Sequence, residues 1–166
     1  METISHYQIN HEALNHYKIA ESNFRNAIGN TNIRVVEFGV TFNKGEPISV
    51  SSGFQFFVKF YNFRAVINLD ATFELRTADD ISVFHHGALI TKEKNSKEGF
   101  YKVKGEIPPY ILNAGIYKFT VIFGENQKYV LFKHTDIIQF EIMNENLGSN
   151  SNILPGMLRP NIGYII

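Results

Sequence analysis

Histidines are the residues of this sequence best suited to metal chemistry, and the chain has six of them. His6, His11 and His16 recur at every fifth position. Five residues of helix rotate a side chain by about 140°, so these three cannot share one face. His85 and His86 are adjacent in a predicted strand, where neighbouring side chains point to opposite faces. The spacing therefore predicts no metal site, and we expect the protein to need no cofactor.

Paired carboxylates can act as general acid and base, and Asp79-Asp80 is a candidate pair. A turn between two strands explains both residues fully. Glu74 and Glu141 could meet across a sheet, but the sequence alone does not bring them together. The chain has no cysteine, and it lacks the phosphate-binding loop, the serine nucleophile elbow and the zinc-protease helix motif. We therefore predict no catalytic residue and no enzyme activity.

The charge balance argues against nucleic acid as a partner. The sequence has 16 basic and 16 acidic residues, whereas nucleic-acid-binding proteins normally carry a basic excess or stripe. No apolar run reaches the roughly 18 residues needed to cross a membrane. The opening METISHYQINHEALNHYK lacks the basic and apolar segments of a secretory signal. We expect a cytoplasmic protein without direct membrane insertion.

The segment before the first predicted strand has helical spacing. Leu14, Tyr17, Phe24 and Ile28 recur at near-helical intervals, and Gly29-Asn30 is a plausible stop signal. The pattern predicts a helix over residues 11–28, within an arm or linker formed by residues 1–30.

From Ile33 onward the apolar period changes from helical to two residues. Turn formers separate the alternating segments about every ten residues. The predicted strands, about eight in number, are residues 33–42, 54–62, 71–77, 81–86, 100–107, 116–124, 129–132 and 136–143. His134 falls in the turn between the last two. The sequence thus predicts an all-β domain over residues 31–143, an antiparallel β-sandwich of immunoglobulin-like or jelly-roll-like type.

Aromatic residues are in surplus on strand faces that should point away from the core. Strand 54–62 places four apolar residues inward, and its other face alternates aromatic with polar side chains. A ring can stack on the C–H face of a sugar, while Lys and Gln side chains hydrogen-bond its hydroxyls. Alternatively, the N-terminal helix or a second chain covers this face. The candidate carbohydrate-binding residues are Gln55, Phe57, Lys59, Tyr61 and Lys102.

The order of these features resembles a known family, the C-terminal carbohydrate-binding domain of Wzt, the ATPase subunit of O-antigen polysaccharide ABC exporters. The resemblance covers roughly residues 28–166 and includes "LNAGIYKFTVIF" and the tail "PGMLRPNIGYII". Tyr164 stands where the family often has Trp. Further positions that match the family are the glycines Gly29 and Gly45 and the Ser-Gly pair Ser52-Gly53.

The resemblance implies a homodimer that binds an O-antigen-type, lipid-linked glycan. It also implies coupling to export by an ABC transporter ATPase domain and a membrane permease, at the inner face of the cytoplasmic membrane. Because this sequence has no phosphate loop, we expect a fragment or stand-alone copy whose helix leads toward the ATPase.

The family also swaps its last strand between subunits, which predicts that residues 144–166 form a linker and a C-terminal strand placed on the partner. The linker "NENLGSNSN" could span about 30 Å. Two alternatives to glycan binding are a structural or protein-interaction sandwich and a glycan-active enzyme. Of these, the enzyme has the weaker support, because no acid/base pair is evident.

Overall fold

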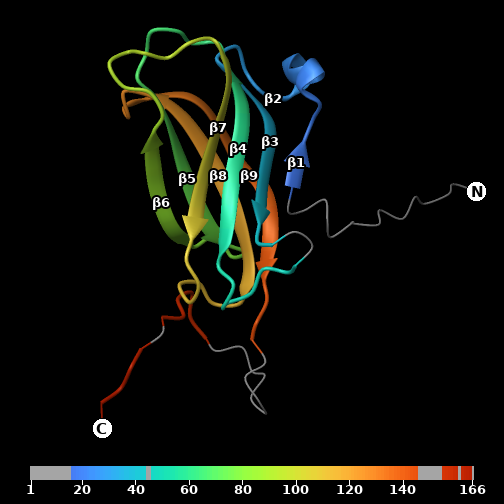
Figure 1. Ribbon diagram of the computed structural model, residues 1–166, viewed down its shortest axis with the longest axis vertical. Helices are drawn as coiled ribbons and strands as arrows, with labels where there is room; N and C mark the ends of the chain where they lie inside the picture. The colour runs from blue at the N-terminus through green and yellow to red at the C-terminus, as the bar shows by residue number, and fades with distance from the viewer. Residues whose placement is uncertain (1–15, 44–45, 146–154, 161, 166) are drawn as a thin grey trace, which may run out of the picture.

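The computed structural model describes residues 16–43, 46–145, 155–160 and 162–165. Two antiparallel sheets pack face to face as a sandwich, with the first sheet in front of the second in Figure 1. Strand order is β1-β3-β4-β7 in the first sheet, with β2 also pairing with β3, and β6-β5-β8-β9 in the second. The predicted all-β antiparallel sandwich is confirmed.

The elements have the following bounds. The first sheet contains β1 (His16–Lys18), β2 (Ile28–Gly29), β3 (Ile33–Thr41), β4 (Phe54–Asn62) and β7 (Gly99–Ile107). The second contains β5 (Leu69–Thr77), β6 (Ser82–Leu89), β8 (Gly115–Glu125) and β9 (Tyr129–Ile142). A short 3-10 helix, η1 (Glu21–Asn26), connects β1 and β2.

The core lies between the sheets and is rich in phenyl rings. Phe56 of β4 packs 5.0 Å from Phe119 of β8, and Phe60 packs 4.4 Å from Phe123, measured between ring centroids. Burying a large apolar side chain of this kind contributes about 1.5–3 kcal/mol. The alternation predicted these inward positions, which in β4 and β8 are Phe54, Phe56, Val58, Phe60, Tyr117, Phe119, Val121 and Phe123.

The predicted helix over residues 11–28 is wrong for its described part. Residues 16–18 form β1, in which His16 lies opposite Gly39 of β3, and helical structure is limited to the 3-10 turns of η1. Residues 11–15 lie outside the described residues. An isolated helix of this length is marginal in water, whereas the edge of β3 offers a ladder of hydrogen bonds. That pairing overrides the helical spacing of the apolar residues.

The two last predicted strands are one strand, β9, and His134 lies within it opposite Val121. Pairing with β8 shifts between Phe119 and Val121, as expected at a β-bulge. At the bulge, Asp136 has a positive φ of 53°, and its backbone N–H donates to the Thr120 hydroxyl at 3.2 Å. The bulge absorbs the extra residues, so the polar run that predicted a turn does not end the strand.

The described part of the C-terminal tail contacts the segment before β8 and Asn144 after β9, and then leads away from the sandwich (Figure 1). Leu158 forms a bridge with Leu112, and the Arg159 backbone N–H donates to the Ile111 carbonyl at 3.0 Å. Beyond this bridge, the apolar side chains Ile162, Tyr164 and Ile165 are exposed. The swap of residues 153–166 onto a partner stays a prediction.

None of the helices among the described residues is long and apolar enough to cross a membrane.

Candidate functional site

The outward side of β4 and β7, here called the outer face, carries all five predicted site residues. In the ladder, Lys59 lies opposite Lys102 and Tyr61 lies opposite Phe100. Residues directly opposite each other share a face, and so do alternate residues along a strand. Gln55 and Lys102 are exposed, whereas Phe57, Lys59 and Tyr61 are half-buried.

The 3-10 helix η1 covers one end of the outer face. The ring of Phe24 stacks on Tyr61 with centroids 4.2 Å apart and meets the ring of Phe100 edge-on at 5.7 Å. Phe63 lies 4.8 Å from Tyr61 and completes this aromatic cluster. The N-terminal segment therefore covers the aromatic rings at this end of the face, but through the 3-10 helix η1 and not through the predicted helix over residues 11–28.

Polar contacts of Lys59 and Tyr61 reinforce this cover. Lys59 forms an ion pair with Glu21 of η1, and its ammonium lies 5.6 Å from the centroid of Phe100. The Tyr61 hydroxyl donates to a carboxylate oxygen of Glu98 at 3.1 Å. Burial, followed by this hydrogen bond, raises the pKa of Tyr61, so the phenol is neutral at physiological pH.

The other end of the outer face, around Phe57, is not covered by η1. The ammonium of Lys102 lies 4.8 Å from the centroid of the Phe57 ring, and His16 meets that ring edge-on at 5.9 Å. Gly39 allows both rings to lie close to β3, because a Cβ there would come within 2.9 Å of each. Phe57 is therefore an aromatic platform flanked by an exposed cation.

A shallow polar cavity of about 230 Å³ lies beside Gln55 at this end. Its other lining residues are Thr41, Phe42, Asn43, Ser52, Phe54 and Glu106. Hydroxyl, amide and carboxylate groups thus stand next to an aromatic platform, which is the combination that a hydroxyl-rich ligand requires.

The outward side of the second sheet carries a charge-balanced cluster. Arg76 and Lys118 each contact both Asp80 and Asp136, with Arg76–Asp80 at 3.4 Å and Lys118–Asp136 at 3.7 Å. A hydrogen bond from Lys118 lowers the pKa of Asp80. Asp80 is therefore held as a carboxylate by its neighbours, which does not suit it to act as a general acid.

The histidines do not gather. His16 contacts Glu37 at 2.8 Å, while His85 and His86 are both exposed on β6. His6 and His11 lie outside the described residues. In the part of the chain that the structure describes, no three His, Asp or Glu side chains could jointly hold a metal ion.

Fold and face together define a two-layer β-sandwich with a partly covered aromatic surface. No protein-family model matches the sequence, and no curated protein matches it. Among solved structures, the chain is similar to a crystal structure of the C-terminal domain of Wzt, with a TM-score of 0.67. The match covers 83% of this chain and 86% of that one at 12% identity. At that identity the similarity shows the fold alone.

Some residues of the face were not among the predicted site residues. Phe24, Arg25 and Phe63 reach it from segments that the sequence assigned to a helix and to a loop. Phe24 was predicted to lie on the apolar stripe of the arm, so its partial burial could be expected. The spacing did not predict that its ring would stack on Tyr61. Arg34 of β3 lies opposite Tyr61, and it was not predicted because the aromatic surplus that marked the face lies on β4 and β7.

Proposed function

We propose that this chain is a non-catalytic carbohydrate-binding domain that recognises an O-antigen-type, lipid-linked polysaccharide. The observation that carries the proposal is the half-buried ring of Phe57 beneath Lys102, on a sheet whose opposite side is a filled core. Such a ring is not needed for core packing. The similarity of the fold to the C-terminal domain of Wzt supports the same proposal.

The recognition would use both ends of the outer face. Phe57 would stack on the C–H face of a pyranose ring, with Lys102 moving aside to donate hydrogen bonds to its hydroxyls. Gln55 would serve the next sugar at the polar cavity. Lys59 and Tyr61 would form the wall toward η1, where the Tyr61 ring is in contact with Phe24.

In this proposal, glycan binding is coupled to export by an ABC transporter ATPase domain and a membrane permease, at the inner face of the cytoplasmic membrane. The domain would act as a homodimer through its tail. Tyr164 is 82% exposed in the single chain. Covering each large apolar side chain of the tail on a partner would contribute about 1.5–3 kcal/mol. Because ordering the backbone costs about 1–2 kcal/mol per residue, the swapped strand would also have to form ladder hydrogen bonds with the partner's sheet.

Glycan-array screening followed by calorimetric titration tests the proposal. Phe57→Ala should weaken binding by more than about 1 kcal/mol, a factor of about five. Tyr129→Ala is the matched control, since Tyr129 is an exposed aromatic at the start of β9 with Lys128 5.4 Å from its ring centroid. Equal losses for both variants would place the binding elsewhere.

The alternative is a structural or protein-interaction sandwich. It is favoured by the aromatic cluster at η1, where the ring of Phe24 packs against the rings of Tyr61 and Phe100 and leaves them less accessible to a glycan. Two results together would support this alternative. The unmodified protein would bind no bacterial polysaccharide on the array, and Phe57→Ala would abolish binding of a protein partner instead.

A further inference from the structure

A second cavity lies at the covered end of the outer face, between η1 and β3. It measures about 200 Å³ and is lined by Arg25, Asn30, Thr31, Arg34 and Phe63. We call it the arginine pocket. Two guanidinium groups and an aromatic ring thus border a space large enough for one charged substituent and part of a ring that carries it.

Arg34 is positioned by the tight connection between β2 and β3. One terminal nitrogen of its guanidinium, Nη1, donates to the Ala27 carbonyl at 2.9 Å. Gly29 makes room for the stem of this side chain, because a Cβ at position 29 would lie 2.9 Å from the Arg34 Cδ. A guanidinium has five N–H donors, and the described residues accept from it only at this carbonyl. Its remaining donors are available to a ligand.

Arg25 enters the pocket from η1, with its guanidinium carbon 5.2 Å from the centroid of Phe24. Among the described residues, neither Arg25 nor Arg34 forms an ion pair with a carboxylate. The acidic side chains nearby have other partners, since Glu21 pairs with Lys59 and Glu98 accepts from Tyr61. Two positive charges therefore border one small space without internal compensation.

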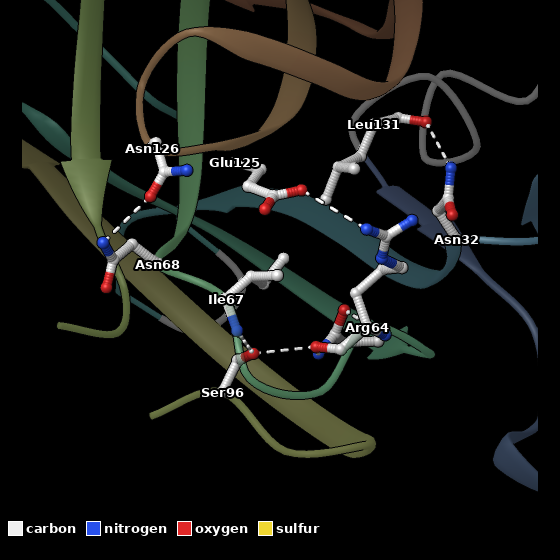
Figure 2. Close-up of polar contacts among 9 residues, drawn as sticks. Asn32, Arg64, Ile67, Asn68, Ser96, Glu125, Asn126 and Leu131 are labelled. Carbon is white, nitrogen blue, oxygen red and sulfur yellow. Dashed lines mark hydrogen bonds and ion pairs between the residues drawn. The ribbon is translucent and has the colours of Figure 1, made fainter. Parts of the chain in front are cut away.

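Hydrogen bonds hold the turn at the floor of the pocket in place. The Asn30 amide nitrogen donates to the Leu131 carbonyl at 2.8 Å, and its side-chain oxygen accepts from the backbone N–H groups of Asn32 and Ile33. Asn32 reaches the same Leu131 carbonyl, as Figure 2 shows. These bonds fix the turn between β2 and β3 to β9 of the other sheet, so little reorganisation is needed when a ligand binds.

We propose that the arginine pocket binds the carboxylate of an acidic sugar, which rests on the carbohydrate-binding function proposed above. Guanidinium groups hold a planar carboxylate through paired hydrogen bonds, and the ring of Phe63 can lie against the sugar that carries it. Arg25 and Arg34 supply the charge, and the Thr31 hydroxyl is a further donor at the rim. The pocket adjoins the aromatic cluster of the outer face, so an acidic residue would extend a glycan bound there.

The test is an NMR titration of the full chain with methyl β-D-glucuronoside, and with methyl β-D-glucoside as the neutral probe. We expect the glucuronoside to bind at least about tenfold more tightly and to shift the amides of Thr31 and Arg34. Arg25→Gln and Arg34→Gln should each weaken it by about fivefold or more, and added salt should weaken it further.

Two variants control for effects on folding. Arg64→Gln changes a neighbouring arginine whose guanidinium pairs with Glu125 at 3.4 Å (Figure 2), and it should leave binding unchanged. Arg34→Lys keeps the charge but loses the planar fork, so it should bind the glucuronoside less tightly than the unmodified protein while retaining a folded spectrum.

The outcomes separate this inference from the proposed function. If neutral glycans bind on the array while the glucuronoside gains nothing over the glucoside, the acidic-sugar site is overturned and the carbohydrate-binding function stands. If no array glycan binds but the glucuronoside binds through Arg25 and Arg34, the pocket stands and the broader function fails. Equal binding of inorganic phosphate would overturn the carboxylate assignment in favour of a general anion site.

Discussion

Removing the ring of Phe24 tests whether aromatic contacts hold the N-terminal segment on the sheet. The ring stacks on Tyr61 and also contacts Phe100 and Phe63, at 5.7 and 6.0 Å between centroids. Pairs of this kind contribute about 0.5–1.5 kcal/mol beyond the area they bury. Because Phe24 is only half-buried, we expect Phe24→Ala to lower the free energy of unfolding by about 2 kcal/mol, less than a core phenylalanine would cost.

Differential scanning calorimetry measures this loss. A domain of this length loses about 2–4 °C of melting temperature per kcal/mol, so the expected decrease is about 4–8 °C. Amide hydrogen exchange should quicken in β1 and η1 while the centre of β8 stays protected. The pKa of Tyr61 should fall toward its ordinary value, because burial is the largest cause of its elevation. Ser22→Ala, at an exposed position of the same 3-10 helix, is the control.

The reasoning is refuted if Phe24→Ala melts within about 1 °C of the unmodified protein and β1 exchanges no faster. The pairing of β1 with β3 would then hold the segment without the ring, and the stacked geometry would carry little energy.

Further predictions concern packing, pH, the tail and metals. Gly105→Ala should lower the free energy of unfolding in urea by about 1–3 kcal/mol, because a Cβ there would come 2.1 Å from the ring of Phe56. Gly163→Ala is the control and should change it little, because a Cβ there would meet no atom within 4 Å. Burial raises the pKa of Asp70 above 3.8, so the folded protein favours the neutral form of this carboxyl. The free energy of unfolding should therefore fall as pH rises from about 4 through the pKa of the folded state. Asp70→Asn should remove this fall, which urea midpoints measured across that pH range would show. Truncation after Asn150 should turn a dimer into monomer or aggregate by light scattering, and a stable truncated dimer would disprove the swap. Addition of EDTA should leave the melting temperature and glycan binding unchanged; a marked drop would reveal a metal that we do not expect.

The strands and the core were predictable because one physical rule governs both. Side chains alternate across a strand, so the apolar residues of β4 had to face the second sheet, and Phe57 and Tyr61 had to face outward. The structure confirms this orientation. Whether these residues bind a glycan stays a prediction, since orientation does not identify a ligand.

The covering of the outer face was not predictable from local pattern. The segment around Tyr17 and Phe24 fits helical spacing, and only the nearby edge of β3 makes a strand the better choice for residues 16–18. The contact of Phe24 with Tyr61 joins residues far apart in sequence, which periodicity cannot report. The bulge at Asp136 was missed for the related reason that a polar run signals a turn and a bulge equally well.

Gly39 has a consequence for how this sequence can diverge among its homologues. It lies opposite His16 on one side and Phe57 on the other, and both rings approach within 2.9 Å of where a Cβ would be. Any larger residue at position 39 would displace the anchor of the N-terminal segment and the aromatic platform together. Position 39 should therefore covary with positions 16 and 57 and not with the core. Residues larger than glycine should occur there only in homologues that lack an aromatic ring at both of those positions.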